Sequence, residues 1–265
     1  MASDAPNAAA GEIGIAYRLG GPAVTMTAGA ASGSAWEASV TRAGYAGPPD
    51  GCRSGATWGD DDSIIVATAN EATGLHRVAS TGGEPTVLTR PNVARGERDH
   101  LWPQFLPGGR AVLFTVTSTT ANVDASQVAV LDLRTGAQTI LISNGSQAQY
   151  TASGHLVYVA ADRLWAVAFD TERLAVIGEP VAVVSQVART PNGTAEFDIS
   201  RDGTLVYVPT ASGAGATRTL VWVDRQGREE PVKGAPSRAY VFPRLSPDGA
   251  RLALDVRDQE NDIWV

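Results

Sequence analysis

The sequence has little of the residue types on which metal sites and catalytic centres commonly depend. Its 265 residues include one cysteine, Cys52, and three histidines. A single cysteine excludes an intramolecular disulfide and a cysteine-based metal site. The histidines fall at different positions of the strand pattern described below, so they do not predict a shared zinc site. They are His76, His100 and His155.

Long apolar runs and an excess of positive charge are also missing. No stretch approaches the roughly 18 apolar residues of a membrane-spanning helix, so no membrane insertion is expected. The first residues carry Asp4 in place of a basic segment, and no apolar core follows, so no signal peptide is predicted. The net charge is −7, and Lys233 is the one lysine. This balance argues against nucleic acid or an anionic membrane surface as a partner.

What the sequence does contain is a repeat of short alternating strands and turns. Five segments align on a turn that follows the first strand of each unit: "TWGDDDSIIVAT", "QFLPGGRAVLFT", "QYTASGHLVYVA", "FDISRDGTLVYV" and "PRLSPDGARLAL". Neighbouring turns are 45 to 49 residues apart, and the turn positions are Asp62, Gly109, Gly154, Gly203 and Gly249. A third strand, a polar turn and a fourth short run follow, which is the pattern of a propeller blade.

The sequence therefore predicts an all-β fold, a β-propeller of four-stranded blades. Residues 51–265 hold four full blades and one partial blade, about five in all, and we expect this region to be a fragment of a longer propeller. Residues 1–50 lack the repeat and are rich in Ala, Gly and Ser. They are either a disordered or vector-derived leader, or a segment in which "AVTMTA" or "WEASVTRAGY" supplies a strand that closes the last blade.

Two sets of motifs resemble known families. "LSPDGARLAL" and "NDIWV" resemble the TolB-type propeller repeat, or PD repeat. "GATWGDDDSIIVA", "HLWPQFLPGGRAVLFT" and "LVWVDRQGRE" resemble the propeller that follows the kinase domain in bacterial eukaryotic-like serine/threonine kinases, over about residues 53–265. That resemblance implies an extracytoplasmic or periplasmic sensor module, tethered through a membrane helix to a cytoplasmic kinase. The chain has no glycine-rich phosphate loop, no "HRD" and no "DFG", so it is not itself a kinase.

Candidate binding residues are the polar side chains expected where the innermost strands line the channel mouth. Function must be argued from such residues and not from the fold. The aligned innermost-strand positions are Thr57, Gln104, Gln149, Asp198 and Arg244. Of these, Gln104, Gln149 and Arg244 are the candidates for binding a polar ligand.

Three carboxylates near the same mouth are candidate ligands for a divalent cation, calcium or zinc. They are Asp99, Glu196 and Asp198, and a hard cation needs several such oxygen atoms. The alternative is that they are solvated or pair with arginines. His100 and Asp99 are the candidate catalytic acid–base residues. No cofactor is established by the sequence beyond this candidate cation.

Two functional hypotheses remain. The first is a non-catalytic module that binds a protein, a peptide or a small polar ligand. The second is a promiscuous metal-dependent hydrolase of esters, lactones or phosphotriesters, with its site at the channel mouth. No G-x-S-x-G nucleophile motif is present. Open blade edges would also allow the chain to form a homo-oligomer.

Overall fold

The computed structural model describes residues 12–17, 55–68, 71–120, 122–189, 193–200, 203–210, 217–223, 228–246, 250–257 and 261–265. These residues form strands, two short 3-10 helices and the turns between them. The chain divides into two compact units, one of residues 27–150 and 154–184 and the other of residues 1–26, 151–153 and 185–265. The all-β prediction is confirmed.

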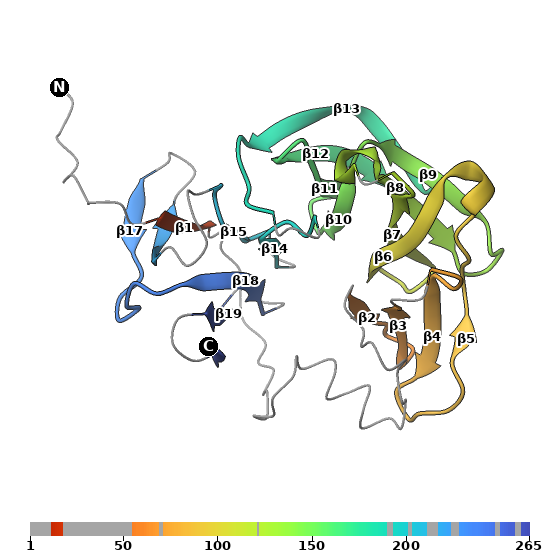
Figure 1. The fold of residues 1–265 in the computed structure, drawn as a ribbon, viewed down its shortest axis with the longest axis horizontal. Helices are drawn as coiled ribbons and strands as arrows, with labels where there is room; N and C mark the ends of the chain where they lie inside the picture. The colour runs from red at the N-terminus through yellow and green to blue at the C-terminus, as the bar shows by residue number, and fades with distance from the viewer. Residues whose placement is uncertain are drawn as a thin grey trace. The chain divides into compact units, whose positions relative to one another are not determined.

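The first unit contains three four-stranded antiparallel sheets, which we call blades 1 to 3 (Figure 1). Blade 1 consists of β2 (Ala56–Trp58), β3 (Ser63–Ala67), β4 (Leu75–Ala79) and β5 (Thr86–Val87). Blade 2 consists of β6 (Glu97–Phe105), β7 (Ala111–Ser118), β8 (Gln127–Asp132) and β9 (Gln138–Ser143). Blade 3 consists of β10 (Ser146–Thr151), β11 (His155–Ala160), β12 (Arg163–Asp170) and β13 (Ala175–Val184). The helices are η1 (Val93–Arg95), before β6, and η2 (Val123–Ala125), between β7 and β8.

The second unit contains two sheets. Blade 4 consists of β14 (Phe197–Ile199), β15 (Leu205–Tyr207), β16 (Arg218–Val223) and β17 (Glu229–Pro231). An additional strand, β1 (Glu12–Tyr17), lies between β15 and β16, antiparallel to the first and parallel to the second. Blade 5 has three strands, β18 (Tyr240–Leu245), β19 (Leu252–Arg257) and β20 (Asn261–Trp264). Four full blades and one partial blade were predicted, and this count is confirmed.

The N-terminal segment joins the sheets at a place that the sequence did not indicate. Its described strand is "EIGIAY", β1, and this strand belongs to blade 4 and not to the partial blade 5. The two predicted closing strands, residues 23–28 and 36–45, lie outside the described residues. Whether either one pairs with blade 5 therefore stays a prediction.

The turn residues that define the repeat share one backbone conformation. Asp62, Gly109, Gly154 and Gly203 have φ values of 58°, 65°, 79° and 88°. This left-handed region suits glycine and tolerates aspartate, whereas most other side chains are strained there. The repeat thus encodes one tight turn between the first and second strands of each of blades 1 to 4.

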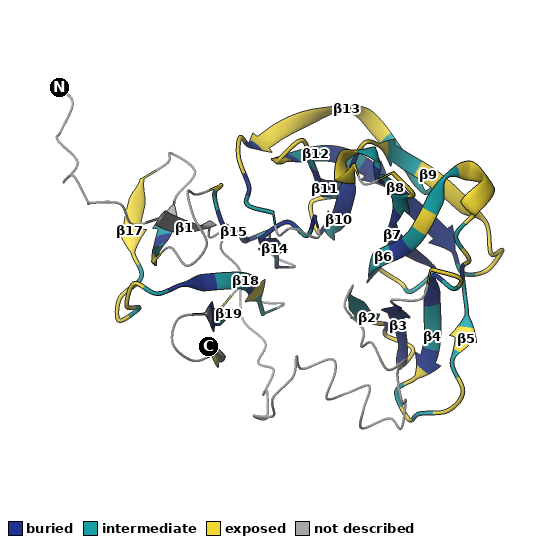
Figure 2. Cartoon of the chain, viewed as in Figure 1, coloured by how far each residue is buried: buried dark blue, intermediate teal, exposed yellow. Residues whose placement is uncertain are grey.

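In the first unit the core lies between successive blades, because the middle strands are buried on both faces. On β7, the side chains of Val112, Phe114 and Val116 pack in a cluster with Ile65 and Leu75 of blade 1. Residues 111 and 113 of the same strand point the other way, into a second cluster with blade 3. Period-two alternation therefore supplies two apolar faces from one strand. Figure 2 shows the middle strands β3, β7, β8 and β11 largely buried and the outer strands β9 and β13 largely exposed.

No helix in the part of the chain that the structure describes is long and apolar enough to cross a membrane.

Candidate ligand-binding pocket and inner-strand residues

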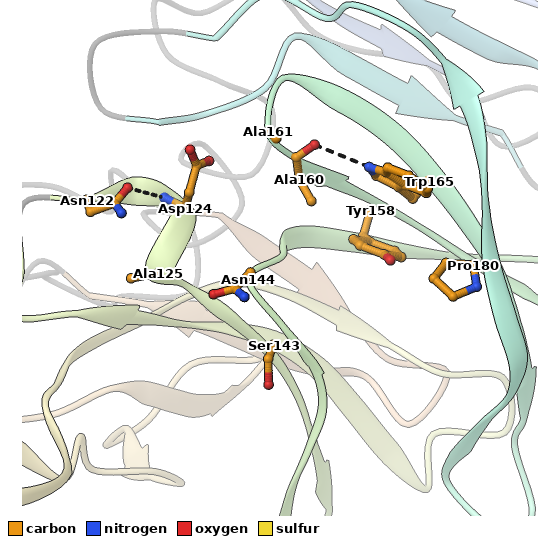
Figure 3. Close-up of a pocket in the computed structure, with 10 residues that line it drawn as sticks. All are labelled: Asn122, Asp124, Ala125, Ser143, Asn144, Tyr158, Ala160, Ala161, Trp165 and Pro180. Carbon is orange, nitrogen blue, oxygen red and sulfur yellow. Dashed lines mark hydrogen bonds between the residues drawn. The ribbon is translucent and has the colours of Figure 1, made fainter.

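The first unit has a pocket at one end of blades 2 and 3. In an up-and-down blade, the second strand ends at the same side of the sheet where the third and the next first strand begin. The β7–β8 connection, the β9–β10 connection and the β11–β12 turn therefore meet at one end. They line an open pocket of about 450 Å³ (Figure 3). The described residues that line it are Asn122, Asp124, Ala125, Ser143, Asn144, Tyr158, Ala160, Ala161, Trp165 and Pro180.

Two aromatic side chains form one wall of the pocket. Tyr158 on β11 and Trp165 on β12 are directly opposite each other in the antiparallel pair, so they lie on the same face of blade 3. The Trp165 indole N–H donates to the carbonyl oxygen of Ala160 at 3.3 Å, as Figure 3 shows. This bond fixes the edge of the indole, while the ring remains half-buried in the pocket wall.

The Tyr158 ring is held from below by a glycine. A Cβ atom at Gly145 would lie 2.9 Å from Cδ2 of Tyr158, so only glycine allows this approach. Tyr158 is 5% exposed, and burial raises the pKa of its hydroxyl. The phenol therefore stays neutral at physiological pH and acts as an apolar surface with a polar tip.

The opposite side of the pocket is polar. Asn122 precedes η2, and its side-chain oxygen accepts the Asp124 N–H at 3.0 Å, which closes a local turn. The Gly145 N–H donates to the carbonyl of Ser126 at 2.9 Å and fastens the β9–β10 connection to the segment before β8. Asn144 has a φ of 59°, a conformation that asparagine tolerates. In Figure 3, Asn122 and Asp124 lie across the pocket from Trp165 and Pro180.

His100, a candidate acid–base residue, lies on β6 with its ring buried at 0% exposure. Its Nδ1 is 2.7 Å from Oγ1 of Thr89, and its Nε2 is 3.4 Å from Oε2 of Glu97. Thr89 Oγ1 accepts the Leu75 N–H at 2.8 Å, and its own hydroxyl proton is available to Nδ1. This arrangement favours a neutral imidazole with its proton on Nε2. Burial lowers the pKa of His100, against the opposing effect of Glu97.

The surroundings of His100 favour a packing role. Its ring lies 4.9 Å from that of Phe114, centroid to centroid, and joins blade 1 to blade 2 through Thr89. A general base must come within hydrogen-bonding reach of its substrate, and a ring without exposed surface does not offer this contact. A catalytic role for His100 stays a prediction.

Asp99, the second candidate, is half-buried beside His100. Its Oδ1 accepts the His100 backbone N–H at 2.7 Å. Desolvation raises the pKa of Asp99 to about 6, with a further rise from the charge of Glu71. The hydrogen bond from His100 and the charge of Arg98 oppose this rise. Asp99 is therefore a carboxyl group that changes protonation close to neutral pH.

The inner-strand residues share a structural contact that recurs from blade to blade. Three of them accept a hydrogen bond from a backbone N–H of the next inner strand. Thr57 Oγ1 accepts from Phe105 at 3.1 Å, Gln104 Oε1 from Tyr150 at 2.6 Å, and Asp198 Oδ2 from Leu245 at 2.8 Å.

Glu196 makes the same kind of contact within the second unit. It is 6% exposed, and its Oε2 accepts the Phe242 N–H at 2.6 Å. The aligned positions were expected at a channel mouth, and the structure uses at least Gln104 and Asp198 as links between neighbouring sheets.

The other two predicted ligand-binding residues occupy aligned inner-strand positions. Gln149 lies on β10, half-buried. Arg244 lies on β18, and its guanidinium donates to the carbonyl of Pro243 at 2.9 Å. Arginine has no acceptor atom, so Arg244 cannot form the blade-to-blade contact of Gln104 and Asp198.

The predicted cation ligands are divided between the two units. Asp99 belongs to the first unit, and Glu196 and Asp198 belong to the second. Among the described residues, no group of three or more His, Cys, Asp or Glu side chains is placed to hold a metal ion. A site that combines all three carboxylates stays a prediction.

The pocket itself was missed in the sequence. The repeat pattern does not predict it, because that pattern describes the connections between strands only as turns. The lengths of the connections between the second and third strands differ between neighbouring blades. This connection has two residues in blade 3 and eight residues, including η2, in blade 2. An extended loop beside a minimal one leaves a recess, and binding residues concentrate on such loops.

Comparison with known proteins shows the fold. No protein-family model matches the sequence, and no curated protein matches it either. The structure resembles a calcium-binding protein, regucalcin, from Agrobacterium tumefaciens, with a TM-score of 0.51 and 17% identity over 78% of this chain and 68% of that one. It also resembles TolB from Acinetobacter baumannii, with a TM-score of 0.50 and 16% identity over 80% of this chain and 51% of that one.

A third similar structure is the Dos1 propeller, with a TM-score of 0.50 and 12% identity over 76% of this chain and 64% of that one. The aligned part thus spans about half of TolB and about two thirds of the other two. At these identities the likeness shows the fold alone. The fold is a β-propeller, and TolB is among the propellers that it resembles.

Proposed function

We propose that this chain is a non-catalytic propeller module that binds a small polar ligand or a peptide segment. The observation that carries the proposal is the pocket of about 450 Å³ beside η2 and the β11–β12 turn. Its size falls within the usual range for ligand sites, about 300–1,000 Å³. Its lining combines an aromatic wall with a few polar groups, which is how such sites provide both affinity and orientation.

The inner-strand contacts support a binding role over a catalytic one. Gln104 and Asp198 direct acceptor atoms at backbone N–H groups of the next sheet. These atoms stabilise the association of neighbouring sheets. His100 likewise contributes its ring to packing between blades 1 and 2.

We further propose that the module is the sensor region of a receptor that resembles the bacterial eukaryotic-like kinases. The motifs described above, such as "GATWGDDDSIIVA" and "LVWVDRQGRE", support this setting. It implies an extracytoplasmic location and a kinase domain on the cytoplasmic side of the membrane. The partner would be a peptide, a protein or a small polar ligand.

A metal-dependent hydrolase is the second candidate, and one observation favours it. The pKa of Asp99 is raised to about 6, mainly by desolvation. A carboxyl group of this kind is suited to proton transfer near neutral pH. Under this alternative, Asp99 would be the acid–base group, and calcium or zinc would be held by carboxylates such as Glu196 and Asp198.

Two assays on the purified chain separate these functions. Chromogenic carboxyl-ester, lactone and phosphotriester substrates are incubated with the protein, with and without chelator. We expect no turnover above buffer. In parallel, a chemically diverse set of small polar compounds and short peptides is screened by NMR. We expect hits that shift the Trp165 indole signal and whose binding, followed by the compounds' own NMR signals, is lost in Trp165→Leu.

The hydrolase hypothesis replaces the binding-module hypothesis if the protein turns over a substrate, if chelator abolishes this turnover, and if Asp99→Asn and Asp198→Ala each lose it. Asp60→Asn, a change of an exposed aspartate in the turn between β2 and β3, serves as the matched control because it removes one carboxylate outside both sites.

A further inference from the structure

The uncharged groups of the pocket decide what it can bind. Its described lining holds no lysine and no arginine, and the chain as a whole has a net charge of −7. A phosphate, sulfate or carboxylate group would therefore lose hydration in the pocket without gaining a cationic partner. The one carboxylate of the described lining, Asp124, already interacts with another residue of the chain. The contacts with a ligand therefore fall to neutral side chains.

Asn122 offers hydrogen-bond donors from a fixed position. It lines the pocket and is exposed. Its Oδ1 accepts the Asp124 N–H at 3.0 Å, the bond drawn in Figure 3. Because this bond identifies the oxygen of the amide, the other end of the side chain is the NH2 group, whose two protons can be donated to a ligand.

Ser143 and Asn144, where β9 ends, add groups that both donate and accept hydrogen bonds. Both side chains are exposed and line the pocket. No hydrogen bond to another described residue engages the Ser143 hydroxyl or the Asn144 amide. The Gly145 N–H bond to the Ser126 carbonyl, at 2.9 Å, holds the connection that carries them. A ligand therefore meets these groups on a backbone that is already ordered, which lowers the entropic cost of binding.

Trp165 supplies an apolar surface to the same pocket. The side chain is half-buried and lines the pocket together with the exposed Pro180. Its indole N–H donates to the carbonyl of Ala160, so a ligand meets the ring only through its carbon surface. The faces of an aromatic ring carry negative electrostatic potential, and they attract the slightly positive C–H groups of a saturated ring.

We infer that the pocket binds a neutral sugar, one pyranose unit, with a C–H face of its ring against Trp165 and its hydroxyl groups bonded to Asn122, Ser143 and Asn144. A pyranose has both kinds of surface that this lining requires, because each of its hydroxyls donates and accepts hydrogen bonds. The inference rests on the proposed binding function and specifies its ligand chemistry. The sugar is either a free monosaccharide or the end of a longer glycan, which an open pocket admits.

The test uses the full chain and the methyl glycosides of glucose, galactose and mannose. Binding is followed by saturation transfer to the NMR signals of the probes themselves, so that it is measured in every variant. We expect at least one glycoside to bind. The methyl glycoside of its uronic acid, which adds a carboxylate, should bind at least about threefold more weakly. Tetrahydropyran-2-methanol keeps the ring without the ring hydroxyls and should bind at least about tenfold more weakly.

Disaccharides that end in the sugar of the tightest-binding glycoside identify the source of the ligand. A disaccharide that binds as tightly as the glycoside or more tightly assigns the pocket to the end of a longer glycan. Weaker binding of the disaccharide assigns it to the free monosaccharide.

Two variants test the apolar and the polar contacts separately. Trp165→Leu should weaken binding of the glycoside at least about fivefold. Its matched control is Trp58→Leu, which removes a tryptophan that is 52% exposed on blade 1 and should leave the affinity unchanged. Asn144→Gly removes the amide from a residue with a φ of 59°, a conformation that glycine accepts, and should weaken binding about three- to tenfold. Its control is Gln138→Ala, which removes an exposed amide from the other end of β9. Thermal unfolding of each variant shows that it is folded.

The outcomes distinguish the inference from the function beneath it. Equal binding of the glycoside and tetrahydropyran-2-methanol, tighter binding of the uronic acid, or an unchanged affinity in Trp165→Leu or Asn144→Gly overturns the assignment to a neutral sugar. A failure of every glycoside, alongside other screened compounds that shift the Trp165 signal, also overturns it and leaves the proposed function in place. A failure of every compound in both experiments overturns the proposed binding function itself.

Discussion

Gly74 has no room for a side chain, because it packs against the contact between His100 and Thr89. A Cβ atom there would be 2.6 Å from both Nδ1 of His100 and Oγ1 of Thr89. The glycine therefore packs against the hydrogen bond that ties blade 1 to blade 2. His100, the most plausible catalytic residue by sequence, is held on all sides by this arrangement. The neighbouring residue Asp99 has a carboxyl group with a raised pKa, which makes the stability of the fold depend on pH.

The raised pKa of Asp99 predicts a specific dependence of stability on pH. The unfolded carboxyl group titrates near about 3.9, whereas the pKa of Asp99 in the folded chain is about 6. Between these values the folded state binds more protons, so this residue makes stability fall as the pH rises from about 4 to about 6. The cost is fully present above about pH 6, and solvent at the half-buried carboxyl limits it to about 1 kcal/mol.

Asp99→Asn removes this cost and keeps the oxygen that accepts the His100 N–H. We expect the variant to be more stable than the parent by about 1 kcal/mol at neutral pH and equal to it below about pH 4. Urea unfolding across this range measures the difference. Asp60→Asn, a change of an exposed aspartate, is the control. A stability difference that does not vary with pH would contradict the raised pKa.

At the scale of strands, the recurring contact between inner strands explains why polar residues occupy these positions. β2, β6 and β14 each carry one acceptor that bonds the backbone of the following inner strand, β6, β10 and β18 respectively. The inner strand of a blade has an edge with unpaired backbone groups, and buried N–H groups need partners. A side-chain acceptor at one register position meets this need in each pair.

Asp198 is the sharpest test of this interpretation, because it was also a candidate metal ligand. Asp198→Ala leaves the Leu245 N–H without its acceptor, and we expect a loss of about 1–3 kcal/mol in the free energy of unfolding. Asp198→Asn keeps an acceptor oxygen and should lose less than about 1 kcal/mol. Thermal and urea unfolding of both variants measure these losses.

The same samples address the metal hypothesis. If Asp198 is a structural hydrogen-bond acceptor, chelator should leave the melting temperature of the parent chain unchanged. If Asp198 holds a cation, chelator should lower the melting temperature of the parent chain. Asp198→Asn should then destabilise the chain as much as Asp198→Ala, since an amide is a poorer ligand for a hard cation. That second pattern would restore the metal site.

At the scale of the molecule, the outer strands decide how the chain meets other molecules. β13 is the edge of blade 3 and carries three exposed apolar side chains in alternation: Ile177, Val181 and Val183. Exposed apolar edge strands promote pairing with another chain, and proteins protect them with charges, prolines and bulges. β13 contains Glu179 and Pro180 midway, with Gly178 at a φ of 73°. These residues leave two short apolar stretches.

We expect the chain to self-associate weakly through this edge. The effect should be concentration-dependent, and Val181→Lys should reduce it by adding a charge to the apolar stretch. Sedimentation velocity over a wide concentration range measures the change. Glu230→Lys, a change on the exposed strand β17, is the control for the altered charge. A monomer at all concentrations, with or without Val181→Lys, would contradict an interface at β13.

The sequence by itself determined the local architecture. Its spaced turn residues, Asp62 and Gly109 among them, predicted the blade boundaries, because a left-handed φ restricts which residues a tight turn accepts. The short apolar runs that recur beside these turns, such as the run in β7, likewise predicted strands. Both are properties of a few neighbouring residues, and both are visible in one chain.

The tertiary structure alone decided what the polar residues contact. Gln104 and Asp198 were placed correctly on inner strands, yet their partners lie 46 and 47 residues away and become neighbours only when the blades pack. The insertion of β1 into blade 4 and the pocket beside Trp165 have the same origin. Such contacts join segments distant in the chain, and no local pattern encodes them, because the free energy that selects them comes from burial of whole faces.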